Sequence, residues 1–176
     1  MSYSHNDWIV ALHIFLCTVG FQLCIPSGIL SLNKLNGSTV PMKMKDRHFE
    51  HLFIQCFGLA CASAGTGIIL FTKTIFTLHS CLGIAANGFI VLSGITGLYE
   101  YVFVFMSENI SRKYLSGINR FIYCIHKLFG TLGFLTSSAS FICGMIKMSF
   151  KNWLPLEEML YASIVFCIFY SLVIVY

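Results

Sequence analysis

The chain has 176 residues, of which 57% are hydrophobic and only 10% are charged, and its mean hydropathy is +0.80. Soluble domains carry about 25% charged residues, so this composition excludes a soluble globular domain and predicts an integral membrane protein. The formal net charge of +4 is modest and does not indicate a nucleic-acid partner.

Five apolar runs follow one another along the chain, at residues 8–32, 48–71, 78–105, 121–148 and 155–176. Each is long enough to cross a bilayer, since a membrane-spanning helix needs about 20 apolar residues. The first run lacks a basic segment ahead of it and is too long for a signal peptide, so we expect it to be a retained helix. The sequence therefore predicts an all-α membrane protein with five transmembrane helices and short loops.

The basic residues predict how these helices are oriented. Two loops, between the first and second and between the third and fourth helices, hold Lys34, Lys43, Lys45, Arg47, Arg112, Lys113 and Arg120. The opposite side holds only Lys73, Lys147 and Lys151. Positive loops favour the cytosol, which places the N-terminus on the non-cytosolic side. The sequons at Asn36 and Asn109 would then remain unglycosylated.

The eight cysteines all fall within predicted helices, and no CxxC pair occurs among them. Thiols in such positions are typical of small, buried apolar residues. We therefore expect no disulfides.

Four of the six histidines fall near the starts of four different predicted helices, namely His13, His51, His79 and His126. The remaining two, His5 and His48, lie in polar surroundings and are expected at the surface. An ionisable group within a membrane span is costly and indicates a functional site.

Each of these four histidines heads a stripe of small residues along one helix face, obtained by stepping four and three residues alternately. The stripes are His13, Cys17, Gly20, Cys24, Ser27 and Ser31; His51, Gln55, Gly58, Ala62 and Gly65; His79, Gly83, Ala86 and Ile90; and His126, Gly130, Gly133, Ser137, Ser140 and Gly144. Close helix packing explains small residues but not the histidines. Our interpretation is that the glycines, Gly83 and Gly130 among them, make room for a large flat group.

Antiparallel neighbouring helices would place His13 with His79 near the outer face and His51 with His126 near the cytosolic face. The two levels would be ~15–20 Å apart. Two imidazoles without carboxylate or thiolate ligands suit a bis-histidine haem iron, whereas zinc needs more protein ligands. The first four helices are thus predicted to form a dihaem-binding bundle. Occupied axial positions favour electron transfer over oxygen chemistry.

The motifs HLFIQ at 51–55, LHSCLG at 78–83 and IHKLFGTLGF at 125–134, with the four histidines, resemble the cytochrome b561 family of transmembrane ascorbate-dependent reductases. The resemblance covers a core at residues 8–148, and the additional C-terminal helix at 155–176 matches by position only. It implies two haem b groups held by the same two histidine pairs. It also implies an oxidoreductase that moves electrons from cytosolic ascorbate to monodehydroascorbate or ferric chelates on the opposite side.

The family's ascorbate site uses basic residues just before the second and fourth histidines, which makes Lys45, Arg47 and Arg120 candidate ligands for the anionic donor. Topology alone could equally explain these charges, and Lys127 could instead pair with a haem propionate. The chain departs from the family in lacking one of six helices, in carrying Phe49 at a basic position, and in offering no comparable outer histidine.

Two alternatives stay open at this point. A histidine-dependent proton or metal-ion transporter would need acidic partners or broken helices near the midplane. A non-catalytic assembly factor would need no haem. The family alone suggests the endoplasmic reticulum, vesicles or the plasma membrane as the location, and the sequence leaves a homodimer open.

Overall fold

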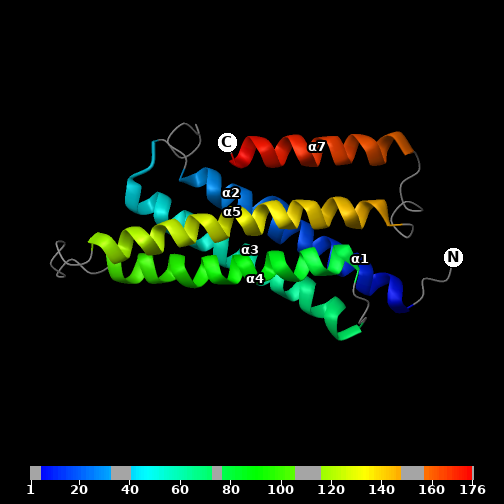
Figure 1. The fold of residues 1–176 in the computed structure, drawn as a ribbon, viewed down its shortest axis with the longest axis horizontal. Helices are drawn as coiled ribbons and strands as arrows, with labels where there is room; N and C mark the ends of the chain where they lie inside the picture. Colours follow the sequence, from blue (N-terminus) through cyan, green and yellow to red (C-terminus); the bar gives the residue numbers. More distant parts are fainter. Residues whose placement is uncertain (1–4, 33–40, 73–76, 106–115, 148–156, 176) are drawn as a thin grey trace.

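The computed structural model describes residues 5–32, 41–72, 77–105, 116–147 and 157–175 (Figure 1). Within these ranges the chain forms helices and no strand, so the predicted all-α class is confirmed. In chain order the elements are α1 (His5–Cys17), the π-helical η1 (Thr18–Cys24), α2 (Ile25–Ser31), α3 (Met44–Thr72), α4 (Leu78–Tyr99), the π-helical η2 (Glu100–Phe105), α5 (Ser116–Ile146) and α7 (Glu157–Val175).

Four stretches are long and apolar enough to cross a membrane, at Trp8–Ser31, Met44–Phe71, Leu78–Val102 and Gly117–Ile146. The first of them runs without a break through α1, η1 and α2. A shorter apolar stretch, Leu160–Ile174, makes up most of α7. The protein is therefore an integral membrane protein with four long helices and a shorter fifth.

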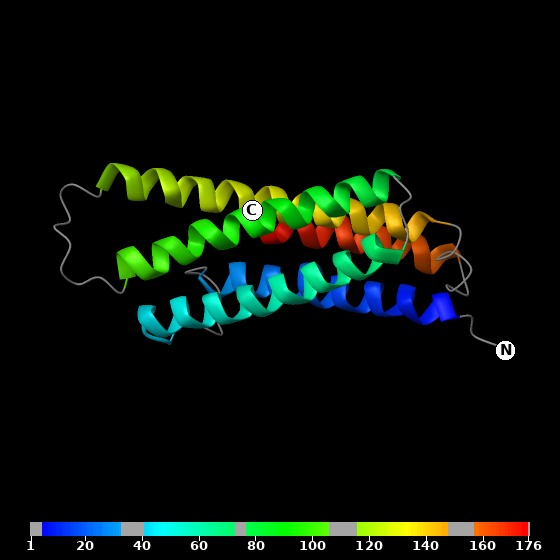
Figure 2. The same cartoon turned by 90° about the horizontal axis from the view of Figure 1, so that it is seen from below.

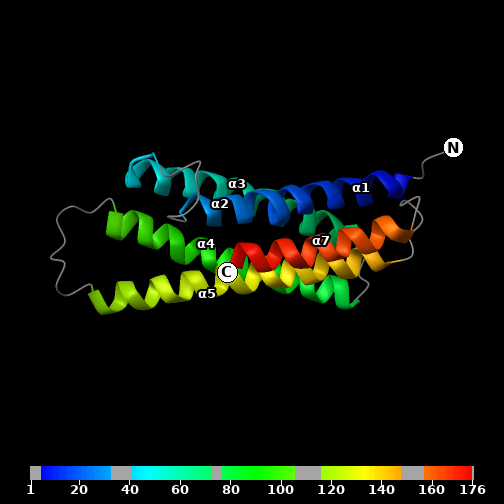
Figure 3. The ribbon, with the colours of Figure 1, turned by 90° about the horizontal axis from the view of Figure 1, so that it is seen from above.

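The four long helices form two hairpins that pack face to face (Figures 2 and 3). The first hairpin pairs α1–η1–α2 with α3, and the second pairs α4 with α5. Helix α7 lies outside this bundle, along α5 (Figure 1). Two hydrogen bonds hold it there: Tyr170 Oη donates to the carbonyl oxygen of Gln22 over 3.1 Å, and Ser171 Oγ donates to Ser138 Oγ over 2.8 Å.

The helices pack closely at the middle of the bundle. A Cβ atom on Gly20 would lie 2.7 Å from both the amide nitrogen of Ala62 and the carbonyl oxygen of Gly58, so only glycine permits this approach of η1 and α3. A Cβ on Gly133 would lie 2.5 Å from Ile90 Cγ1. Small residues allow membrane helices to pack backbone to backbone. Helix packing thus explains the central glycines of the stripes.

The predicted stripe of the first helix is wrong at Ser27, although its last member, Ser31, is buried. Ser27 is exposed, and the buried residue is Gly28, where a Cβ would meet the side chain of Gln55 at 2.5 Å. The cause is η1, because a π-helical turn holds one residue more than an α-helical turn and rotates all later residues. A uniform helix period does not anticipate this shift.

All eight cysteines are free thiols in this structure. The expectation that they are all buried is wrong, because Cys56, Cys81 and Cys124 lie on exposed helix surfaces. In a spanning helix such a surface can face lipid, which a thiol tolerates as a small apolar group.

Several residues used for the predicted topology lie outside the described residues, namely Lys34, Asn36, Lys73, Asn109, Arg112, Lys113 and Lys151.

Candidate functional site

The four histidines of the stripes lie together in two pairs. The ring centroids of His13 and His79 are 6.2 Å apart, and those of His51 and His126 are 6.1 Å apart. Each pair takes one histidine from each hairpin. These are the two pairs expected from the antiparallel order of the helices.

Each imidazole is oriented by a backbone carbonyl of the other helix in its own hairpin. The Nδ1 atoms of His13, His51, His79 and His126 lie 2.8, 2.6, 2.8 and 2.8 Å from the carbonyl oxygens of Gly65, Gly28, Ser140 and Ser93 respectively. Because a carbonyl oxygen can only accept, each Nδ1 carries the proton and donates it. The lone pair is then on Nε2, and metal-binding histidines are commonly fixed in this manner.

The separations of the rings fit a metal ion shared by each pair. A metal–imidazole bond is about 2.0–2.1 Å long and the bound nitrogen lies about 1.2 Å from its ring centroid, so two rings on opposite sides of one ion have centroids roughly 6.4 Å apart. Among the described residues, no group of three or more His, Cys, Asp or Glu side chains could hold a metal ion. A metal at either pair therefore needs a chelating group of its own. Haem iron fits this donor set, and zinc does not.

The two pairs lie at opposite ends of the bundle. Ser140, whose carbonyl binds His79, is 14 residues after His126 along α5, which corresponds to a rise of ~21 Å. This is close to the predicted separation of the two levels. The expected position of His126 near the start of its helix is wrong, however. Helix α5 begins at Ser116, five residues earlier than predicted, so His126 lies nearly three turns from the helix start.

The glycines near the histidines lie against neighbouring side chains. A Cβ on Gly97 would lie 2.7 Å from Cε1 of His126, and a Cβ on Gly144 would lie 2.9 Å from Cε1 of His79. Gly83 and Gly130 instead face the hydroxyl groups of the two serines that back the rings: their Cβ atoms would lie 3.3 Å from Ser140 Oγ and 3.2 Å from Ser93 Oγ. A role of Gly83 and Gly130 at a haem stays a prediction.

Sequence reasoning missed Ser93 as a functional residue. The signal that could have revealed it is an internal repeat, because His79, Gly83, Ser93 and Gly97 recur 47 residues later as His126, Gly130, Ser140 and Gly144. Ser140 appeared only as one small residue of a stripe.

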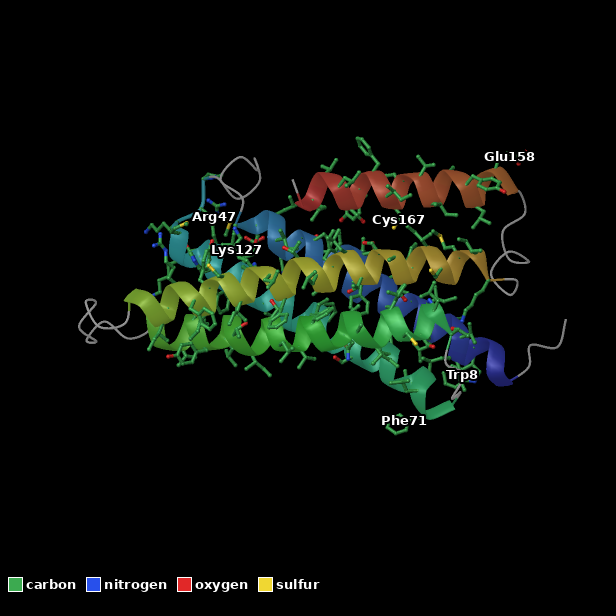
Figure 4. The ribbon with its side chains drawn as sticks, viewed as in Figure 1. Trp8, Arg47, Phe71, Lys127, Glu158 and Cys167 are labelled. Atoms are coloured by element: carbon green, nitrogen blue, oxygen red, sulfur yellow. The ribbon has the colours of Figure 1, made fainter. Side chains whose placement is uncertain are left out.

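The predicted donor-binding residues lie at the end of the bundle that holds His51 and His126. Figure 4 shows Arg47 and Lys127 at this end and Trp8 and Phe71 at the other. Lys45 and Arg120 are exposed. Arg47 is only 6% exposed, and its Nε donates to the carbonyl oxygen of Ser31 over 3.0 Å, so it caps the last turn of α2. The Nζ atom of Lys127 lies 5.6 Å from the ring centroid of Tyr123.

Comparison with known proteins identifies one family. The family model described as eukaryotic cytochrome b561 matches residues 12–151, which include all four paired histidines. No curated protein and no solved structure matches the chain.

Proposed function

The chain belongs to the eukaryotic cytochrome b561 family, and from that premise we propose that it transfers single electrons from cytosolic ascorbate to monodehydroascorbate or a ferric chelate across the membrane. Membership supports transmembrane electron transfer through haem b in general. The donor, the acceptor and the number of haems are our proposal. One observation carries it: two histidine pairs, with ring centroids 6.2 and 6.1 Å apart, lie at opposite ends of a four-helix bundle.

In this proposal His51 and His126 hold one haem b near the cytosolic face, and His13 and His79 hold a second near the other face. Bound haem supplies a one-electron couple. The chain's own contribution is to fix Nε2 of each ring toward the iron through the Nδ1 hydrogen bonds. Two imidazoles for each group would favour electron transfer over binding of oxygen or substrate at the metal.

We propose that ascorbate, an anion, docks on the exposed cations Lys45 and Arg120 at the end of the bundle that holds His51 and His126. Arg47 would add its positive charge from a fixed, buried position, because its side chain is bonded to the end of α2. An arginine presents a rigid fork of donors suited to planar anions, and a lysine acts as a point charge.

The distribution of charge supports placing this end in the cytosol. The described lysines and arginines there are Lys43, Lys45, Arg47, Arg120 and Lys127, against Lys147 at the other end. Cytosolic loops carry the excess of basic residues, so the N-terminus would be non-cytosolic. An endoplasmic reticulum, vesicle or plasma membrane location, and assembly as a homodimer, belong to the same proposal.

A reduced-minus-oxidised absorption spectrum of the purified protein, with haem counted per chain, tests the core of the proposal. We expect two low-spin b haems that ascorbate reduces. His51→Ala and His126→Ala should each remove one haem, and His13→Ala and His79→Ala the other. His48→Ala is the matched control, because His48 lies one turn before His51 and its Nδ1 lies 2.7 Å from the carbonyl oxygen of Met44 in its own helix.

A protein without haem would overturn the proposal, and so would histidine variants that lose haem in a different pairing. The donor site is tested separately. Lys45→Gln and Arg120→Gln should each raise the ascorbate concentration needed for half-maximal reduction several-fold, while Lys147→Gln, at the other end, should not. Equal effects of all three would show that the docking site is elsewhere.

A further inference from the structure

The second hairpin carries an internal two-fold repeat that places a serine behind each of its histidines. The residues His79, Gly83, Ser93 and Gly97 of α4 recur at a constant spacing of 47 residues in α5, as His126, Gly130, Ser140 and Gly144. Because α4 and α5 run antiparallel, the histidine in the first half of each helix faces the serine in the second half of the other.

The same three contacts are made at both ends. The carbonyl oxygen of Ser93 accepts from His126 Nδ1 over 2.8 Å, Ser93 Oγ lies 3.1 Å from that Nδ1, and Ser93 Oγ donates to the carbonyl oxygen of His126 over 3.1 Å. The corresponding distances between Ser140 and His79 are 2.8, 3.2 and 2.9 Å. Both serines are buried. Because the same serine–histidine contacts occur at both ends of the hairpin, we take them as a feature of the histidine sites.

The direction of each bond follows from the donors available. The serine proton is donated to the histidine carbonyl, which leaves the lone pairs of Oγ to accept. The Nδ1 proton is therefore shared between the serine carbonyl and the serine hydroxyl. Gly83 and Gly130 leave space for these hydroxyls, since Cβ atoms there would approach them to 3.3 and 3.2 Å.

The first hairpin lacks this arrangement. The carbonyls that receive His13 and His51 belong to Gly65 and Gly28, which have no side chain to offer. Each histidine pair therefore combines one ring whose receiving residue adds a serine hydroxyl with one ring whose receiving residue is a glycine; His13 Nδ1 also lies 3.6 Å from Cys17 Sγ, one turn along its own helix.

We propose that Ser93 and Ser140 are positioning residues for iron ligation, each acting through one of the histidines that would hold the metal, His126 and His79 respectively. This rests on the proposed function. Partners of Nδ1 fix the ring and raise the basicity of Nε2, and their loss typically costs 10–100-fold in metal affinity or activity. A more basic ligand stabilises ferric over ferrous iron. Removing either hydroxyl should therefore raise the reduction potential of one haem and weaken its retention by up to about 10-fold.

The test is a redox titration of purified, haem-loaded Ser93→Ala and Ser140→Ala, together with the low-spin electron paramagnetic resonance spectrum, which reports ring orientation. The histidine variants assign each potential to its pair. Ser93→Ala should shift only the haem of His51 and His126, and Ser140→Ala only the haem of His13 and His79. Ser93→Cys and Ser140→Cys keep the side-chain volume with a much weaker hydrogen-bonding group, and should give the same shifts if an alanine variant does not fold.

Ser137→Ala is the matched control. Ser137 is buried on the same helix as Ser140, but its hydroxyl donates to the carbonyl of Phe134 in its own helix over 2.7 Å. Unchanged potentials in the Ser93 and Ser140 variants would overturn the inference, and so would equal shifts of both haems or the same shift in Ser137→Ala. In each of these outcomes the wild-type protein still binds haem, so the proposed function stands. A wild-type protein without haem would instead remove the proposed function itself.

Discussion

Replacement of Gly97 by alanine tests the histidine site with a single methyl group. The new Cβ would lie 2.7 Å from Cε1 and 2.9 Å from Nδ1 of His126. Non-bonded carbons prefer about 3.5–4.0 Å, so the ring must retreat by roughly 1 Å or α4 and α5 must separate. A ligand geometry tolerates only about 0.5 Å of displacement. The variant should therefore lose the haem held by His51 and His126.

The size of the effect follows from the cost of overpacking, which is typically about 1–3 kcal/mol. If that cost falls on haem binding, the affinity drops roughly 5- to 140-fold, since about 1.4 kcal/mol corresponds to a factor of ten. Gly88→Ala is the matched control on α4. A Cβ on Gly88 meets nothing within 4 Å, so this variant carries the helix-propensity gain of up to about 1 kcal/mol without the clash.

The assay is haem per chain after exposure to a competing apoprotein that removes weakly bound haem. Gly97→Ala should retain one haem, and Gly88→Ala should retain two. Gly144→Ala should lose the other haem, because its Cβ would lie 2.9 Å from Cε1 of His79. If Gly97→Ala keeps both haems, or if Gly97→Ala and Gly144→Ala lose the same one, the glycines do not set the positions of the rings.

Three further changes test the scaffold. Deletion of Leu23 should remove the extra residue of η1, leave the 14-residue spacing of the other three helices between His13 and Gly28, and so keep both haems in a haem count, as Leu23→Ala should; loss of the haem at the α2 end would show that the extra residue itself is needed. Arg47→Gln should lower the stability by about 1–3 kcal/mol in thermal unfolding, because it removes a buried charged donor, and exposed Lys45→Gln should not. Tyr170→Phe should cost about 1 kcal/mol through the lost hydrogen bond of α7, and exposed Tyr161→Phe should cost nothing measurable.

Much of the bundle was predictable from hydropathy and spacing. The stripes of α3, α4 and α5 point inward as expected, and Gly58, Ala62, Ala86, Ile90 and Gly133 are buried or tightly packed. These three helices keep the α-helical period through their stripes, so stepping by four and three residues follows one face. Antiparallel order then suffices to place each histidine at one end of the bundle.

Some features depend on relations between helices that a single helix does not reveal. The bond from Arg47 to the carbonyl of Ser31, on the helix before the loop, is one of them, and the role of Arg47 in binding the donor stays a prediction. The proximity of Ser93 to His126 is likewise a relation between two helices, visible in the sequence only as a repeat spaced by 47 residues. Within a stripe, the sequence does not distinguish residues that lie against a histidine ring, such as Gly144, from residues that only allow close helix packing.

The π-helical turn η1 lets the first hairpin reach the same arrangement of histidine and receiving carbonyl as the second hairpin. In α3, α4 and α5, the residue whose carbonyl receives the partner's imidazole lies 14 residues after that helix's own histidine. At 3.6 residues per turn, 14 residues return the chain to nearly the same face, about 21 Å along the axis. In the first helix the spacing from His13 to Gly28 is 15 residues, which in a regular α-helix would turn Gly28 away by about 100° more. The extra residue of η1 absorbs this turn and brings the carbonyl of Gly28 back to His51. All four helices therefore present a histidine and a receiving carbonyl on one face, although their sequences reach that arrangement with different numbers of residues.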